Sequence, residues 1–210
     1  MKAIILRHAE RPKLPSELGL PLRRAGEQCH GITDAGRRAA VEAGTRFKGT
    51  IRAILTSPVR RCVETAASLA LGAGVAAQSI SVASFLSADF FGTFAELDEL
   101  AKQEAVKKLL TGEAVPGFNN PRTRCAQVFR LLGDAAEKEP TLFVTHDWWM
   151  ALLLANTTTA FLENGYAIWP DFLESLEVSL SSRTIGYRYQ TYKMAIETSD
   201  ADNQSQGGLS

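Results

Sequence analysis

Two histidines directly follow apolar runs of the kind that form buried strands. His8 comes after residues 4–7, and His146 comes after residues 142–145. In open α/β sheets, ligands bind in a crevice at the carboxyl ends of the strands. We therefore expect the two imidazoles to lie together at one end of a sheet. There, one imidazole could accept a phosphoryl group and the other could stabilise its oxygens.

Arginines gather near the same strand ends. Arg7 and Arg11 flank His8, and Arg60 and Arg61 follow a third strand-like run. A charge at the end of a buried strand, such as Arg7, is costly unless it is paired. Cations in the first turn of a helix oppose the helix dipole, and a bound anion would reverse that cost. For Arg60 we expect a solvated surface position.

Three acidic residues could act as a proton donor. Asp147 adjoins His146 at an expected strand-to-helix turn, where a carboxylate can cap the helix, act as a general acid, or do both. Glu10 and Asp89 are the other candidate acids. The histidines with Asp147 and Glu10 could instead bind a metal. The nearby arginines would repel a divalent cation and no HxxH or HExxH spacing occurs, so we expect neither a metal nor another cofactor.

The composition is that of one soluble globular domain. The chain has 210 residues, 45% of them hydrophobic and 22% charged, which are ordinary values. Its formal net charge is zero, so no global field points to nucleic acid or an anionic membrane. No run approaches the ~18 apolar residues of a membrane span. The first apolar run ends at Arg7, which is too short for a signal peptide.

The cysteines indicate a reducing compartment. Cys29, Cys62 and Cys125 are an odd number and lack metal-type spacing. Reduced thiols in a cytoplasmic protein are the simplest interpretation. The sequence leaves the oligomeric state open.

The segments that would position these residues alternate between strands and helices. Strands are expected over 2–7, 52–56, 80–85 and 141–145, and helices over 35–48, 58–71, 122–137 and 147–155, with a helical pattern over 85–110. This alternation is typical of a largely parallel sheet with helices on both faces. Residues 173–192 resemble two strands that turn at Ser181 and Ser182, which would add antiparallel edge strands.

We expect one domain over residues 1–198. The loop 11–31 and the insert 85–121 would roof the site, since long loops in small domains are often functional. The polar tail 199–210 has the composition of a disordered segment. Trp148 and Trp149 could line the pocket or fill the core.

Several of these segments resemble the motifs of the histidine phosphatase superfamily, also called the phosphoglycerate mutase-like fold. Residues 6–12, LRHAERP, look like the RHG motif of the family, with Ala9 where glycine is usual. Residues 32–36, ITDAG, resemble its LTxxG motif, and residues 144–146 match its second histidine.

A further motif of the family assigns one arginine. Residues 56–66, TSPVRRCVETA, resemble TSxLxRAxxTA. The alignment places the phosphate-binding arginine at Arg61 rather than Arg60. Together the motifs run in order over residues 4–150, which makes the combination specific.

The chain combines features of the two branches of the family. Arg11 and the pair His146-Asp147 resemble the acid-phosphatase-like members. Mutase-like members instead carry a glutamate before an aromatic-Gly step, which is Phe91-Gly92 here. Ala88 occupies the place of that glutamate, and Asp89 is the nearest acid.

The resemblance implies a metal-independent phosphomonoesterase that forms a phosphohistidine at His8 and acts on a small phosphorylated metabolite. Asp147 would protonate the leaving oxygen. The residues implied to hold the transferring oxygens are Arg7, Arg11, Arg61 and His146. Two alternatives are a phosphoglycerate-type mutase, which the missing glutamate disfavours, and a non-catalytic phospho-ligand binder, which a broken pocket would reveal. Neither nucleic acid nor a membrane is an expected partner.

Overall fold

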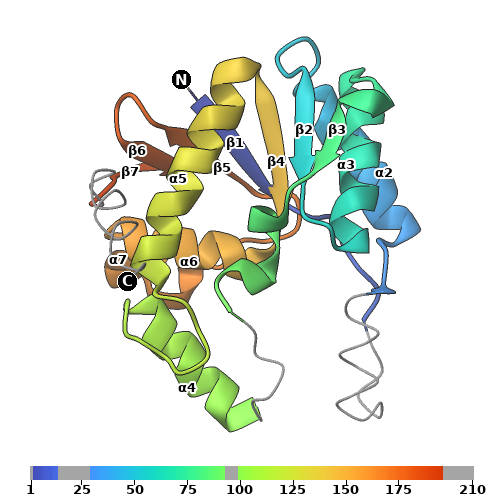
Figure 1. The fold of residues 1–210 in the computed structure, drawn as a ribbon. Helices are drawn as coiled ribbons and strands as arrows, with labels where there is room; N and C mark the ends of the chain where they lie inside the picture. The colour runs from blue at the N-terminus through green and yellow to red at the C-terminus, as the bar shows by residue number, and fades with distance from the viewer. Residues whose placement is uncertain (1, 14–28, 93–98, 196–210) are drawn as a thin grey trace, which may run out of the picture.

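A mixed sheet organises the chain, for which a computed structural model describes residues 2–13, 29–92 and 99–195. In this part of the chain seven strands pair in the order β3-β2-β4-β1-β5-β6-β7. They are β1 (Lys2–Arg7), β2 (Ala53–Thr56), β3 (Ile80–Val82), β4 (Thr141–Thr145), β5 (Ser175–Ser179), β6 (Thr184–Tyr187) and β7 (Gln190–Lys193). The first four in this order are parallel, and β5 to β7 continue the sheet in antiparallel pairing (Figure 1).

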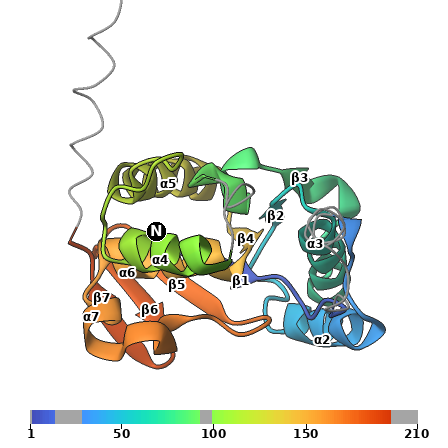
Figure 2. The same ribbon diagram turned by 90° about the horizontal axis from the view of Figure 1, so that it is seen from below.

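Helices cover both faces of the sheet. They are α2 (Asp34–Thr45), α3 (Arg60–Ala73), α4 (Glu99–Leu110), α5 (Pro121–Lys138), α6 (Asp147–Thr157) and α7 (Ala160–Asn164). Figure 2 shows α2 and α3 on one side of the sheet and α5 and α6 on the other. The predicted fold class, a largely parallel α/β sheet with antiparallel strands near the C-terminus, is confirmed.

Side chains of the central strands alternate between two cores. Ile5 and Phe143 are fully buried against α5 and α6. Leu6 and Val144, one residue further along the same strands, are fully buried against α2 and α3. This two-residue alternation is the geometry of a strand that is covered on both faces. The apolar runs in front of both histidines are therefore the centre of the fold.

Helix α3 begins at Arg60, whereas the sequence pattern predicts that it begins two residues earlier, at Pro58. The backbone stays extended through Ser57, whose amide donates to the Val144 carbonyl at 3.0 Å. Val59 is also extended, with φ −69° and ψ 131°, and serves as the N-cap of a helix that starts at Arg60. Pro58 is thus outside the helix, because the sheet ladder holds the chain beyond the end of β2.

The helical pattern predicted over residues 85–110 is only partly correct. Its first part forms the short 3-10 turns Ser84–Leu86 and Ala88–Phe90, and α4 covers the end of the range. The carbonyl of Phe85 accepts from Trp149 Nε1 at 2.8 Å, and that of Leu86 accepts from Thr145 Oγ1 at 2.6 Å. These tertiary hydrogen bonds use carbonyls that a helix would need for its own ladder. Strand β3 is correspondingly shorter than predicted.

The C-terminal region contains three strands where the sequence pattern predicts two. A turn at Ser181 and Ser182 separates β5 from β6, as expected. A second, two-residue turn at Arg188 and Tyr189 separates β6 from β7, with Tyr187 paired to Gln190. Arg188 and Tyr189 carry none of the Gly or Asn signals of such a turn, so the pattern predicts one continuous strand there. The short helix α7 was also not predicted.

Parts of the predicted organisation lie outside the described residues. These are the tail 199–210, most of the loop 11–31 and residues 93–98 of the insert. The single domain over 1–198 and the roofing role of these segments remain predictions. Trp148 and Trp149 belong to the core, with exposed fractions of 7% and 0%.

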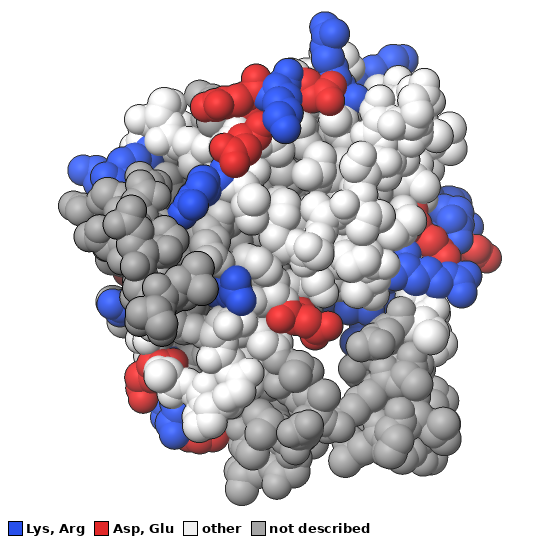
Figure 3. All heavy atoms as spheres, in the orientation of Figure 1, with Lys and Arg blue, Asp and Glu red and all other residues white. Residues whose placement is uncertain are grey.

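Acidic and basic side chains lie next to one another on the face that Figure 3 displays. This agrees with the zero net charge. None of the helices in the described residues is long and apolar enough to cross a membrane.

Candidate active site

The sheet brings three distant segments to one edge. Strand β1 pairs with β4 so that Arg7 is opposite Thr145, and β2 pairs with β4 so that Thr56 is opposite Val144. The strands run in parallel, and their carboxyl ends lie together at the lower side of the sheet in Figure 1. The next residue in each chain segment is His8, Ser57 or His146. The convergence predicted from the three apolar runs is therefore observed.

The Arg61 side chain links the two histidines. Its Nε donates to Nε2 of His8, and its Nη2 lies 3.0 Å from Nδ1 of His146. The distance for the first bond is also 3.0 Å. The imidazole centroids are 5.5 Å apart in an edge-on arrangement. Since a guanidinium is only a donor, the ring nitrogens that face it must accept.

These hydrogen bonds define the protonation of both rings. The remaining nitrogen of His8, Nδ1, carries hydrogen and donates to the Ala9 carbonyl at 2.8 Å. The remaining nitrogen of His146, Nε2, lies 2.9 Å from Ser57 Oγ. Both imidazoles are thus neutral, and His8 presents an unprotonated Nε2 to the site. That is the form a nucleophilic histidine requires.

Burial and charge keep the histidines neutral. Desolvation, followed by the charge of Arg61, lowers the pKa of His8 to about 3. The same two causes lower the pKa of His146 well below its ordinary value. The exposed fractions of the two residues are 2% and 1%. A cation in direct contact with two buried imidazoles is an arrangement suited to an anion that separates them.

A buried thiol lies beside His146 without being part of the chemistry. Cys62 Sγ is 3.6 Å from both the Thr145 carbonyl and Nε2 of His146. Burial raises the pKa of Cys62 to about 12. The group therefore remains a thiol and fills the space between α3 and β4.

Arg7 is held at the rim of the site by three contacts. Its Nη1 donates to the Pro170 carbonyl at 2.6 Å, and its Nη2 is 2.9 Å from Asp147 Oδ2. Its guanidinium lies 4.1 Å from the ring centroid of Phe172. The Nε of Arg7 is buried and has no hydrogen-bond partner within the described residues. A buried donor without a partner is rare in folded proteins.

Asp147 is the first residue of α6, and His146 is its N-cap. The Asp147 carboxylate accepts from the backbone amide of Trp148 at 2.8 Å and pairs with Arg7. Its side chain is 28% exposed, so solvent reaches it. Asp147 thus lies beside Arg7, between the protein interior and the solvent.

The other two candidate acids lie in different surroundings. Glu10 is exposed, and its carboxylate accepts from Thr33 Oγ1 at 2.9 Å at the start of α2. Asp89 is exposed in the 3-10 turn Ala88–Phe90. Of the three acids, Asp147 has the ion pair with a candidate phosphate ligand.

The remaining two arginines differ in their surroundings. Arg11 is half-buried, and its charge contributes to lowering the pKa of both Arg7 and His146. Arg60 has a side chain that is 66% exposed and forms an ion pair with Glu64 over 2.7 Å. Arg60 is therefore a surface residue, although it is adjacent to Arg61.

Two supporting residues hold this arrangement in place. Thr65 Oγ1 accepts from the Ala9 amide at 3.0 Å and donates to the Arg61 carbonyl at 2.7 Å. It thus ties the loop after His8 to the turn that carries Arg61. Glu64 accepts from the Ile32 amide at 3.0 Å and anchors the segment in front of α2.

Sequence reasoning missed the residues near Arg7 that come from the segment before β5. Phe172 lies against Arg7 and, at 5.7 Å between ring centroids, against His8. The carbonyl of Pro170 binds Arg7. A single surface aromatic and a backbone carbonyl carry no pattern that a sequence could reveal. Thr65 and Ser57, by contrast, lie within the motif over residues 56–66.

The described residues contain no group of three or more His, Cys, Asp or Glu side chains that could hold a metal ion. The two site histidines are instead linked by the donors of Arg61. The expectation that no metal is needed stays a prediction.

Comparisons with known proteins identify a family and a fold. The family model of the histidine phosphatase superfamily, branch 1, matches residues 4–180. A phosphoserine phosphatase from Entamoeba histolytica, crystallised with phosphoserine, is 18% identical, with a TM-score of 0.54 and coverage of 94% of this chain and 96% of that one. A mycobacterial glucosyl-3-phosphoglycerate phosphatase is also 18% identical, with a TM-score of 0.54 and coverage of 93% and 98%. No curated protein matches the sequence.

The family match and the phosphatase neighbours support a phosphatase with the phosphoglycerate mutase-like fold. The chain belongs to the histidine phosphatase superfamily. The superfamily predicted from the motifs is therefore confirmed. The matching model is that of branch 1. The likeness of His146-Asp147 to the acid-phosphatase-like members therefore does not assign this chain to their branch. It supports only the prediction that Asp147 is the proton donor.

Proposed function

We propose that the protein is a metal-independent phosphomonoesterase that forms a phosphohistidine on His8. The observation that carries this proposal is the Arg61 guanidinium, which donates to His8 Nε2 and lies 3.0 Å from His146 Nδ1. A phosphoryl group entering between the rings would accept these donors. It would leave the lone pair of His8 Nε2 facing phosphorus, as an in-line attack requires.

The reaction has two steps. In the first, the His8 Nε2–P bond forms and the bond from phosphorus to the leaving oxygen breaks, while Asp147 passes to that oxygen a proton taken from the monoprotonated phosphate ester. In the second, water attacks phosphorus, the N–P bond breaks, and Asp147 takes a proton from the water. Arg7, Arg11 and Arg61 would bind the equatorial oxygens, and the unpartnered Arg7 Nε is one donor for them.

His146 can become a donor because its partner is a hydroxyl. In this structure Nδ1 of His146 accepts from Arg61 and Nε2 faces Ser57 Oγ. A hydroxyl can donate as well as accept. If Ser57 donates to Nε2, Nδ1 can carry the hydrogen and bind a phosphoryl oxygen. Ser57 thereby allows His146 to stabilise the charge that spreads over the transferring group.

The substrate is proposed to be a small phosphorylated metabolite. The similar structures are phosphatases of phosphoserine and of glucosyl-3-phosphoglycerate. These compounds, with 3-phosphoglycerate, sugar phosphates, nucleotides, phytate and a phosphopeptide, make a suitable panel. Release of inorganic phosphate supports a phosphatase, and isomerisation of phosphoglycerate would support the mutase alternative. Binding without turnover of any ester would support the non-catalytic alternative.

We also propose a cytoplasmic location. All three cysteines are free, and Cys29 is exposed. Exposed free thiols persist most readily where the cell keeps them reduced.

The first test concerns independence from metals. Hydrolysis of an aryl phosphate should be unchanged by EDTA and inhibited by vanadate and inorganic phosphate, because arginines rather than a metal bind the oxygens. Initial rates before and after chelation measure this. A loss of activity that a divalent metal restores would contradict the proposal.

The second test identifies the acid. Asp147→Asn should lower the turnover of alkyl phosphates by ~10²–10⁴-fold, because an alkoxide leaves poorly without a proton. Nitrophenyl phosphate should lose much less, since its leaving group is stable unprotonated. Rates for a series of leaving groups show the trend, and Asp89→Asn and Glu10→Gln are the matched controls. A leaving-group-dependent loss in a control variant, with none in Asp147→Asn, would assign the acid elsewhere.

A further inference from the structure

The segment that carries Pro170 and Phe172 is the part of the site that no motif predicts. It comes between α7 and β5, outside every motif of the sequence, and it contacts the end of β1. Besides the two contacts to the Arg7 side chain, the Glu174 carbonyl accepts from the Arg7 amide at 2.9 Å. The position of Arg7 therefore depends on the conformation of this segment.

The conformation of the segment is not one that its sequence favours by itself. Leu173 has a φ of 60°, in a region that side chains with a Cβ seldom adopt. Glu174 folds back on the segment, with its amide donating to the Asp171 carbonyl at 3.1 Å and its carboxylate accepting from the Asp171 amide at 2.7 Å. Something outside the segment must stabilise this shape.

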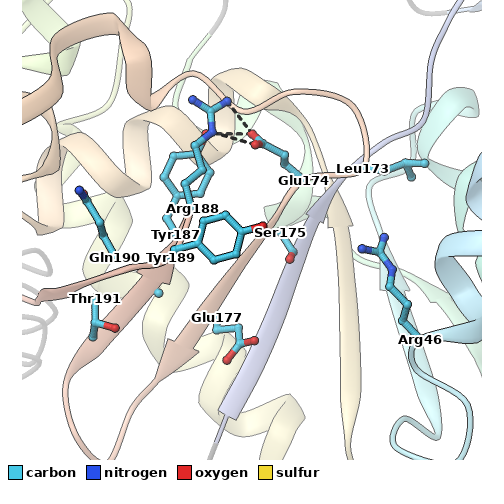
Figure 4. A pocket seen from close by; sticks show the side chains of 11 residues that line it. Arg46, Leu173, Glu174, Ser175, Glu177, Tyr187, Arg188, Tyr189, Gln190 and Thr191 are labelled. Carbon is cyan, nitrogen blue, oxygen red and sulfur yellow. Dashed lines mark hydrogen bonds and ion pairs between the residues drawn. The ribbon is translucent and has the colours of Figure 1, made fainter.

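Arg188 makes five hydrogen bonds to this part of the chain. Its Nε and Nη2 bind the two oxygens of Glu174 at 2.7 and 2.8 Å, a fork-to-fork pair. The other three partners are the Ala167 carbonyl at 2.6 Å, the Trp169 carbonyl at 3.2 Å and Asp171 Oδ2 at 3.3 Å. Tyr187 adds a hydrogen bond of 2.9 Å from its hydroxyl to Glu174. Figure 4 shows Arg188 and Glu174 facing each other, with Tyr187 beside them.

The backbone at Arg188 is adapted to this contact. Arg188 and Tyr189 form the two-residue turn between β6 and β7, with φ values of 45° and 66°. Positive φ at both positions is the requirement of a type I′ turn, which normally selects Asn and Gly. An arginine in this position is disfavoured by the backbone, and its five hydrogen bonds supply a reason for its presence. The ion pair lies at the edge of a surface pocket of about 540 Å³.

We infer that Arg188 is a positioning residue for phosphate binding, which acts by holding residues 167–174 so that Pro170 and Phe172 fix Arg7 beside His8. The inference rests on the proposed function for its kinetic part. Arg188, which lies far from the motifs in the sequence, would thus be one of the residues that determine the geometry of the phosphate site. A misplacement of about 1 Å in such a group can cost ~10²-fold in rate.

The experiment compares Arg188→Met and Arg188→Lys with Arg183→Met. Arg183 is the matched control because it is also an arginine at positive φ, 52°, in the neighbouring turn between β5 and β6. Aryl phosphate kinetics and calorimetric binding of inorganic phosphate are measured well below the melting temperature. Arg188→Met should raise the dissociation constant of phosphate ~10-fold and lower kcat/KM by ~10–10²-fold. Arg188→Lys should be intermediate, because lysine keeps the charge but loses the fork.

A double-mutant cycle with Phe172→Leu tests the route of the effect. If Arg188 acts through the segment, the two losses in phosphate affinity should not add. Unchanged phosphate affinity and kcat/KM in Arg188→Met, whatever its melting temperature, would overturn the inference. So would equal losses in Arg183→Met. A wild-type protein that binds phosphate without hydrolysing esters would contradict the proposed function alone, and the affinity comparison would still decide the role of Arg188.

Discussion

His8→Ala should abolish hydrolysis of an aryl phosphate, to below the detection limit of an assay in which the wild-type enzyme is readily measured. The reason is that Nε2 of His8 is the unprotonated nitrogen of the site, and alanine has no group that can form the bond to phosphorus. Circular dichroism and thermal unfolding should show a folded protein, because His8 follows β1 and is outside its apolar core.

The covalent intermediate provides the direct measurement. Rapid acid-free quenching after mixing with a ³²P-labelled ester should trap label on the wild-type protein that is stable in base and released by acid, as an N–P bond requires. His8→Ala should show no such label. His30→Ala is the matched control, since His30 is the one histidine of the chain outside the pair, and it should retain both activity and label. Near-wild-type turnover in His8→Ala would exclude a phosphohistidine at this residue.

Arg61→Met should reduce kcat/KM by at least ~10³-fold. The guanidinium contacts both imidazoles. Loss of one preorganised hydrogen-bond donor to a transition state costs ~10²–10³-fold in rate. Arg61 supplies two such donors, so its loss should cost more. The affinity for phosphate and vanadate should fall with it. Removing this cation also raises the pKa of both histidines, because the charge of Arg61 lowers each of them.

Arg60→Met is the control for this prediction. It removes the same charge one residue earlier in α3, where the side chain is exposed and pairs with Glu64. Its activity should stay within a few-fold of wild type, because surface ion pairs contribute little. If Arg60→Met lost activity and Arg61→Met retained it, the alignment of residues 56–66 with the family motif would be wrong by one residue. Arg60 rather than Arg61 would then be the phosphate-binding arginine.

The candidate active site was largely predictable, because the positions of its residues follow directly from local sequence. Each of its main residues comes immediately after a buried strand or in the first turn of a helix, and parallel strands place such ends at one edge. The placement of His8 and His146 at one edge of the sheet follows from these local patterns alone. The motif over residues 56–66 also decided between Arg60 and Arg61, which local physics alone treats alike.

The surroundings of that centre could not be predicted in the same way. The sequence pattern merges β6 and β7 into one strand, since the turn at Arg188 and Tyr189 uses residues that disfavour positive φ. It also extends a helix through residues 85 and 86, whose carbonyls are taken by side chains of β4 and α6. In both places, tertiary hydrogen bonds outweigh the local preference of the backbone.

The sequence by itself determined the strand-end histidines and the α/β class, because these depend on hydrophobic periodicity and on neighbours in the chain. The likeness of residues 56–66 to a family motif singled out Arg61. Only the tertiary structure decided which acid pairs with Arg7, that Trp148 and Trp149 belong to the core, and that Pro170 and Phe172 hold Arg7. The contacts of Arg7 join residues more than a hundred positions apart, through side-chain geometry and a backbone carbonyl. Such contacts leave no periodic trace in a single sequence, so they emerge only when the chain is folded.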